Sequence, residues 1–164
     1  MIEKKERPQR VAGYTESIRT SYGKLFVTIN ERDGQIFEVF GSLGGVDSEA
    51  VGFLMALCRL VSISLRYQTP VDEIIRMLNG ISGAQPLFTE VKSPITGEVV
   101  SRTIKSIPDA IAKALILWKK DREVLEEQAR KAIENGELVI HTLDGNKLRV
   151  EEDNKKPDFE VLEG

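Results

Sequence analysis

The stretch Ser21-Tyr22-Gly23-Lys24-Leu25-Phe26-Val27-Thr28-Ile29-Asn30-Glu31-Arg32-Asp33-Gly34-Gln35-Ile36-Phe37-Glu38-Val39-Phe40 decides the fold. Two runs rich in β-branched and aromatic residues flank Asp33-Gly34, a dipeptide that supplies the positive φ of a tight hairpin turn. The pattern therefore predicts a β-hairpin. Residues 14–19 add a possible third strand, which would make a small antiparallel sheet with one face that needs a helical cover.

The residues after this hairpin supply the cover. Apolar side chains recur at three- and four-residue spacing from Ser48 to about Tyr67, and Phe53 and Leu60 widen the stripe beyond one face. This pattern predicts a central, well-buried helix. Pro70 then opens a shorter helix, which the dipeptide Asn79-Gly80 ends.

Turn and capping signals in the C-terminal half predict a second hairpin, a further helix and a terminal hairpin. A turn at residues 94–97 indicates a second small hairpin, and the capping-box spacing of Ser106 and Asp109 predicts the start of a further helix. Charged residues dominate that helix through Arg130, and a second Asp-Gly turn at residues 144–145 predicts a terminal hairpin before a short acidic tail. The fold class is α+β: a small antiparallel sheet covered by two or three helices, with a C-terminal charged helix and β-hairpin.

Composition narrows the function classes. The chain has 164 residues, of which 41% are hydrophobic, so one compact domain is expected. A net charge of -3 gives no global attraction to nucleic acid or an anionic membrane. We expect a cytoplasmic protein without a membrane partner, because no apolar N-terminal run is present. Cys58 is expected to be a buried thiol and His141 a surface strand residue, so we predict no metal site.

Several blocks of the sequence, in this order, resemble one known module, the TSCPD domain. These blocks are Arg7-Pro8, Tyr22 to Asn30, Phe37-Glu38-Val39-Phe40, Gly44-Gly45, Glu49-Ala50-Val51-Gly52, Asp72-Glu73-Ile74-Ile75 and Ser106 to Ala114. The TSCPD domain is similar to the C-terminal region of adenosylcobalamin-dependent, class II ribonucleotide reductases. The resemblance divides the chain into a basic N-terminal arm (1–6), a TSCPD-like α+β domain (7–118) and a C-terminal extension (119–164).

The resemblance departs from the family at its naming stretch. Ser106, Pro108 and Asp109 match the Thr-Ser-Cys-Pro-Asp motif, whereas its threonine and cysteine are replaced by Lys105 and Ile107. The reductase needs a large barrel with a radical cysteine and a redox cysteine pair, which a chain with one cysteine lacks. The resemblance thus implies a non-catalytic accessory or split C-terminal domain that acts in deoxyribonucleotide synthesis by binding the catalytic subunit. Adenosylcobalamin would then belong to that partner, and no cofactor to this chain.

A glycine-rich segment, residues 41–48, leads into the first helix and is a candidate phosphate site. Backbone amides at a helix N-terminus attract anions, although the lysine of a P-loop is missing here. The alternative is a flexible connection that needs positive φ. If a nucleotide or phosphate binds, the first candidates are Gly44, Gly45, Ser48, Arg19 and Lys24.

Other side chains also have candidate roles. A partner, or a second copy of the chain, could dock along Val124, Leu125, Ala129 and Ile133. The acidic residues from Asp121 to Glu127 are expected to form a solvated helix face. Phe53, Tyr67 and Trp118 are assigned to core packing rather than to base stacking. The basic segment at residues 4–24 keeps open an alternative function, a stand-alone nucleic-acid- or nucleotide-binding regulator.

Overall fold

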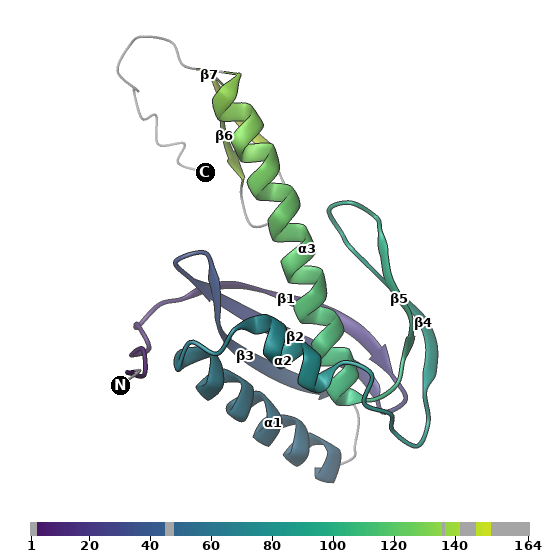
Figure 1. Ribbon diagram of the computed structural model, residues 1–164. Coiled ribbons are helices and arrows are strands. Elements are labelled where there is room, and N and C mark those ends of the chain that lie inside the picture. Colours follow the sequence, from purple (N-terminus) through teal and green to yellow (C-terminus); the bar gives the residue numbers. More distant parts are fainter. Residues whose placement is uncertain (1–2, 45–47, 136, 142–146, 152–164) are drawn as a thin grey trace, which may run out of the picture. The chain divides into compact units, whose positions relative to one another are not determined.

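The computed structural model describes residues 3–44, 48–135, 137–141 and 147–151, with Ser48 and the last two ranges described by their backbone alone. The chain forms the elements shown in Figure 1. In order they are β1 (Ala12–Thr20), β2 (Gly23–Arg32), β3 (Gln35–Gly44), α1 (Ser48–Arg66), α2 (Val71–Leu78), β4 (Leu87–Lys92), β5 (Val99–Ile104), α3 (Ile107–Glu134), β6 (Glu137–His141) and β7 (Lys147–Glu151). This order confirms the predicted α+β class. The chain divides into two units, Met1–Arg122 and Glu123–Gly164, and the boundary falls inside α3.

The first three strands form an antiparallel sheet in the order β1-β2-β3. Asp33 and Gly34 both adopt positive φ, at 54° and 72°, as the predicted hairpin turn requires. The third strand that we predicted from residues 14–19 is β1. Because successive side chains of a strand point to opposite faces, the sheet has an inner face and an outer face of different composition.

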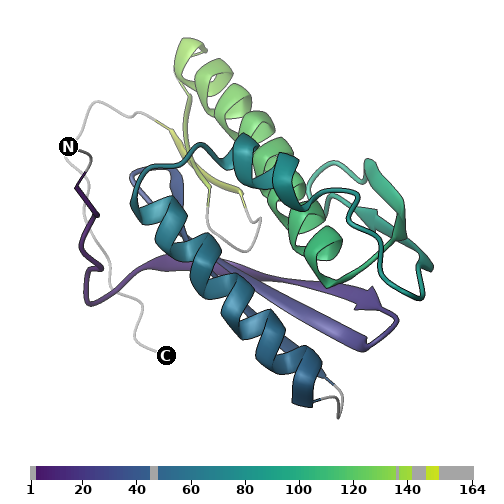
Figure 2. The same ribbon diagram turned by 60° about the horizontal axis from the view of Figure 1, so that its bottom comes forward.

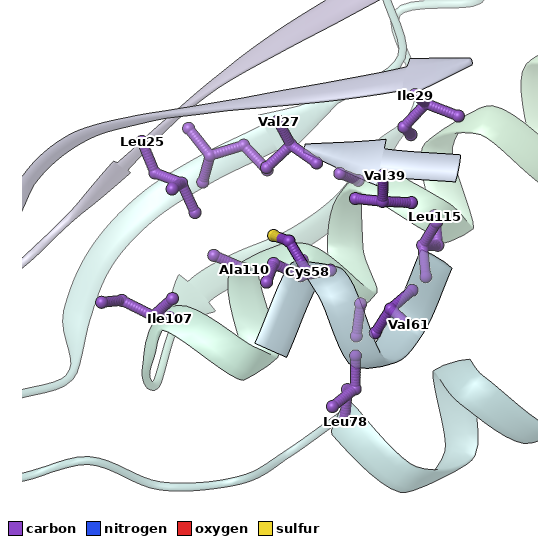
Figure 3. Close-up of a cluster of buried hydrophobic side chains, with 14 of the residues drawn as sticks. Leu25, Val27, Ile29, Val39, Cys58, Val61, Leu78, Ile107, Ala110 and Leu115 are labelled. Carbon is purple, nitrogen blue, oxygen red and sulfur yellow. The ribbon is translucent and has the colours of Figure 1, made fainter. Parts of the chain in front are cut away.

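The inner face of the sheet carries the core of the first unit. Leu25, Val27 and Ile29 of β2 are fully buried there, together with apolar side chains of α1, α2 and α3 (Figure 3). Helix α1 runs along this face (Figure 2), and Ser62 bonds to both the N–H and the C=O of Val39 at 2.9 Å. Each apolar side chain that is fully buried contributes about 1.5–3 kcal/mol, so this layer is the main source of stability.

The prediction of a well-buried α1 was wrong for one side of the helix. Leu54, Cys58, Val61 and Leu65 face the sheet and are buried, whereas Phe53, Leu60 and other apolar residues remain exposed. The cause is the layer arrangement. One sheet can cover only one side of the helix, and none of the described elements of the first unit buries the other side.

The second hairpin, β4–β5, and the start of α3 also match the sequence predictions. Gly97 takes a φ of 72° and its N–H bonds to the C=O of Ser93 at 2.9 Å, which closes the predicted turn at residues 94–97. None of the described helices combines the length and apolar character that crossing a membrane requires.

The second unit contains the last turns of α3 and the hairpin β6–β7, as predicted. In the helix, Glu127 pairs with Lys131 at 3.2 Å and also with Arg130. In the hairpin, Leu138 lies opposite Val150 and His141 opposite Lys147. The turn at residues 144–145, the acidic tail and the side chain of His141 lie outside the described residues.

Candidate functional site

The outer face of the sheet is the most distinctive surface of the first unit. Its side chains form four cross-strand rows, in which one residue each of β1, β2 and β3 lie side by side. The rows are Arg19 with Lys24 and Gly44; Ser17 with Phe26 and Ser42; Thr15 with Thr28 and Phe40; and Gly13 with Asn30 and Glu38. We call these twelve residues the open face, because most of their side chains are exposed.

Two phenylalanines occupy the middle of the open face. Phe26 is 38% exposed and Phe40 is 49% exposed. They sit on neighbouring strands in adjacent rows, so they are diagonal neighbours. Diagonal pairs in a sheet lie about 7–8 Å apart, within reach of each other for aromatic side chains. From the sequence we predicted only that Phe26 lies in a strand of the hairpin. The alternation of β2 already placed it on the same face as Lys24, but which face stays uncovered depends on the helices.

Three of the five predicted phosphate-site residues come together at one end of the open face. Arg19, Lys24 and Gly44 form a single row, and Arg19 and Lys24 also line a cleft of about 370 Å³ between β1 and β4. Lys24 Nζ lies 5.8 Å from the centroid of the Phe26 ring. The other two candidates, Gly45 and the side chain of Ser48, lie outside the described residues.

Two of the glycines before α1, Gly41 and Gly44, do not have the positive φ that a flexible connection would need. Both belong to β3. A Cβ on Gly41 would lie 2.5 Å from Leu54 Cδ1 and 3.0 Å from Cys58 Sγ. Gly41 is therefore needed because α1 packs closely against the backbone of β3.

A buried carboxylate closes the opposite end of the open face. Glu38 is 3% exposed and accepts hydrogen bonds from Arg7 Nε at 2.9 Å and from Asn30 Nδ2 at 2.8 Å. The hydrogen bond to Glu38 also raises the pKa of Arg7. The N-terminal arm is also held at the end of α1, where the Lys5 N–H donates a hydrogen bond to the C=O of Arg66 at 2.9 Å. The guanidinium of Arg7 thus compensates the charge of Glu38.

A second polar group lies inside the first unit. Asp121 is buried, contrary to the solvated face that we predicted, and accepts a hydrogen bond from Ser93 Oγ. The same Ser93 oxygen accepts from the N–H groups of Ile95 and Thr96, so Asp121 holds the β4–β5 turn in place. Burial raises the pKa of Asp121, and the hydrogen bond from Ser93 partly opposes that rise.

Burial and the charge of Asp121 also raise the pKa of Glu16, which lines the cleft beside β4. The neighbouring Tyr14 hydroxyl has no hydrogen-bond partner among the described residues. Both carboxyl pKa values move in the same direction, whereas an acid–base pair needs them moved apart. Among the side chains that the structure describes, no group of three or more His, Cys, Asp or Glu could hold a metal ion.

The residues that match the family motif build the start of α3. Ser106 Oγ accepts from the Asp109 N–H at 3.2 Å, as a capping residue should, and donates to the C=O of Ile81 at 2.7 Å. We had expected Asp109 to answer the amide of Ser106. Its carboxylate instead accepts from the N–H of Lys105 at 3.0 Å and from that of Gly80 at 2.7 Å. The motif therefore joins the end of α2 to the start of α3.

The assignment of three aromatic side chains to the core holds for only one of them. Trp118 is buried and donates to Glu31 Oε1 at 2.5 Å, but Phe53 and Tyr67 are exposed on or just after α1. Cys58 is buried in the core as predicted, and burial raises the pKa of its thiol to about 11.

A comparison with protein-family models identifies the same domain as the sequence motif. A family model described as the TSCPD domain matches residues 2–118, more than two thirds of the chain. Searches of curated proteins and of solved structures gave no significant match. The matched region contains the open face, α1, α2, the β4–β5 hairpin and the first turns of α3. The chain belongs to the TSCPD domain family.

Proposed function

We propose that this protein is a non-catalytic accessory domain of a vitamin B12-dependent ribonucleotide reductase and acts in deoxyribonucleotide synthesis by binding the catalytic subunit. The family supplies the process, because TSCPD domains resemble the C-terminal regions of such reductases. An exposed apolar stripe on α1 supports this mode of action.

The chemistry of the chain favours a binding role. Reduction of a ribonucleotide consumes two electrons, which a dithiol supplies, and the 164 residues contain one cysteine. That cysteine is buried, and its raised pKa of about 11 keeps it as the unreactive thiol at neutral pH. These 164 residues therefore offer no dithiol that could supply the electrons.

The cobalamin is also assigned to the catalytic subunit. The cleft between β1 and β4 measures about 370 Å³, near the lower end of the roughly 300–1,000 Å³ that drug-sized ligands need. A corrin ring with its nucleotide and adenosyl groups is larger than such ligands. The cleft between β1 and β4 is therefore too small to hold the cofactor.

The stripe on α1 is the surface that we assign to the catalytic subunit. It consists of Phe53, Ala56, Leu60, Ile63 and Tyr67, all of them exposed. The spacing alternates between three and four residues, the pattern by which one helix packs against another. The buried side of α1 carries Leu54, Cys58, Val61 and Leu65, so the helix is apolar on two sides while the sheet covers one.

The size of the stripe supports docking. Phe53 is 70% exposed and Leu60 is 64% exposed. With its other members, the stripe leaves roughly 400–500 Å² of apolar surface in water, within the roughly 300–600 Å² of the largest patch on a monomer, which is often functional. A stable interface buries about 800 Å² on each partner, so the stripe would form the apolar centre of one.

Binding of the purified catalytic subunit to the tagged domain, measured by titration calorimetry and by co-purification, tests the proposal. The wild-type domain should bind, and Leu60→Glu should weaken binding at least tenfold, because it places a charge in the apolar centre of the interface. Phe88→Glu is the matched control, since Phe88 is 85% exposed on β4, away from the stripe. It should bind as the wild type does.

Two further outcomes decide against parts of the proposal. A Leu125→Glu variant examines the other predicted surface, formed by Val124, Leu125, Ala129 and Ile133; loss of binding there alone would assign docking to the second unit. A dimer in light scattering that Leu60→Glu dissociates would assign the stripe to a second copy of the chain. Absence of any binding between the domain and the reductase would refute the function itself.

A further inference from the structure

We infer that the open face of the sheet binds single-stranded nucleic acid, with Phe26 and Phe40 stacking on bases and Arg19 and Lys24 contacting phosphates. This site is separate from the α1 stripe, because the stripe lies on the helix that packs against the inner face. The inference therefore goes beyond the proposed docking to a reductase.

The aromatic side chains come first in the argument. A phenylalanine ring exposed on a sheet offers a flat apolar surface, and every nucleobase has a face that can stack on it. Phe26 and Phe40 stand one strand and one row apart. Pairs of this kind on an antiparallel sheet bind successive unstacked bases in single-strand-binding domains. Bases inside a duplex are already stacked on one another, so the geometry favours a single strand.

The charges of the open face suit a polyanion. Arg19 and Lys24 stand next to each other in the end row, and neither makes an ion pair within the described part of the chain. The single acidic side chain of the face, Glu38, is buried under Arg7 and bonded to Asn30. The accessible part of the face therefore carries positive charge, although the chain as a whole has a net charge of -3.

The contact between Lys24 and Phe26 joins the two features. Because the Lys24 ammonium lies 5.8 Å from the centre of the Phe26 ring, a base on that ring has its own backbone phosphate beside a cation. Hydroxyl groups surround the rings and could contact sugars and base edges. Ser17 and Ser42 flank Phe26, whereas Thr15 and Thr28 bond to each other at 2.8 Å beside Phe40.

Fluorescence anisotropy with labelled oligothymidylate and oligouridylate of about 12 nucleotides tests the site on the full chain. Both single strands, or one of them, should bind, and a duplex of the same length should bind more weakly. The slope of log K against log salt should be about −1.4, because two phosphate contacts are expected. A preference for one oligomer would tell whether the site distinguishes deoxyribose from ribose.

The variants separate stacking from simple apolar contact. Phe26→Leu and Phe40→Leu keep an apolar side chain and lose the ring, so each should weaken binding about fivefold, the lower end of the loss seen when a stacking side chain is cut back to alanine. Phe40→Trp should keep the affinity, and the fluorescence of the new indole should be quenched by the bound base. Phe88→Leu, at an exposed phenylalanine outside this sheet, is the control and should change nothing. Lys24→Glu should weaken binding and flatten the salt slope.

Four results would overturn the inference. The first three are the absence of binding at low salt, a duplex that binds as tightly as the single strands, and leucine variants that bind like the wild type. Mononucleotides that bind as tightly as the oligomers would also overturn it, because they would place recognition in a nucleotide pocket rather than along a strand. None of these results bears on the reductase titration, so the two proposals can fail independently.

Discussion

Replacing Asp109 with alanine should destabilise the domain more than any other change at the family motif. The carboxylate is 1% exposed and accepts from the N–H groups of Gly80 and Lys105. An unsatisfied buried amide costs about 1–3 kcal/mol, and water can partly replace the acceptor because both residues lie at the surface. We therefore expect Asp109→Ala to cost about 2–4 kcal/mol, which corresponds to a fall of about 5–15 °C in melting temperature.

Trp118 makes this measurement simple. It is the only tryptophan of the chain and is buried in the first unit, so its fluorescence follows the unfolding of that unit. Ser106→Ala should cost about 1 kcal/mol, the usual loss for a capping residue. The control is Asp72→Ala, which removes an exposed ion pair with Lys119 worth less than about 1 kcal/mol. If Asp109→Ala costs no more than this control, the motif does not join α2 to α3 as described.

Three other predictions follow from packing and burial. Gly41→Ala should lower the free energy of unfolding, measured in urea, by about 1–3 kcal/mol, because the new Cβ would lie 2.5 Å from Leu54 Cδ1. Gly52→Ala should raise it by about 1 kcal/mol, because a Cβ there has nothing within 4 Å and alanine favours the helix. Equal effects would contradict the close packing of α1 on β3. Burial raises the pKa of Glu16, so the folded state keeps the Glu16 proton to a higher pH than the unfolded state does. The free energy of unfolding therefore falls as the pH rises from the unfolded-state pKa to the folded-state pKa. Glu16→Gln should therefore raise the melting temperature at pH 7, with no difference from the wild type below about pH 4, where both states are protonated; a variant that melts lower at pH 7 would refute this sign. Alkylation of Cys58 at about pH 8 should be far slower than that of a free thiol until urea unfolds the chain, because the thiol is buried with a pKa of about 11; reaction of the native chain at the free-thiol rate would show that α1 does not cover it.

The local structure of this chain follows from its sequence because its signals act over short distances. The positive φ of Asp33 and Gly34 comes from the turn that they form. Ser106 caps α3 because its hydroxyl oxygen accepts a hydrogen bond from the N–H of Asp109, three residues further along the chain. Periodicity found each helix in the same way. These features need no knowledge of the rest of the fold.

What the sequence did not reveal depends on contacts between distant residues. Periodicity shows that Phe53 and Leu60 are apolar positions of a helix, but only the layer arrangement decides which side of α1 is covered. The burial of Asp121 depends on Ser93, 28 positions away, and that of Glu38 on Arg7, 31 positions away. The residues next to a charged side chain in the sequence do not indicate such a distant partner.

The candidate site divides in the same manner. Alternation along β2 places Lys24 and Phe26 on one face, and the hairpin turn fixes which residues of β3 lie beside them. The row of Arg19, Lys24 and Gly44 was therefore within reach of sequence reasoning. That this face is the exposed one was not, because it follows from the packing of α1 and α3 on the other side.

Site-specific photo-crosslinking would decide whether the outward side of α1 is the surface by which this domain binds the reductase, as we propose. A benzophenone maleimide attached to Leu60→Cys reports contacts of the stripe, and the buried Cys58 should not compete for the reagent. Our account predicts a cross-link to the catalytic subunit from position 60 and none from Phe88→Cys, the exposed control on β4. A cross-link from position 88 alone, or from neither position while the two proteins are bound, would contradict it.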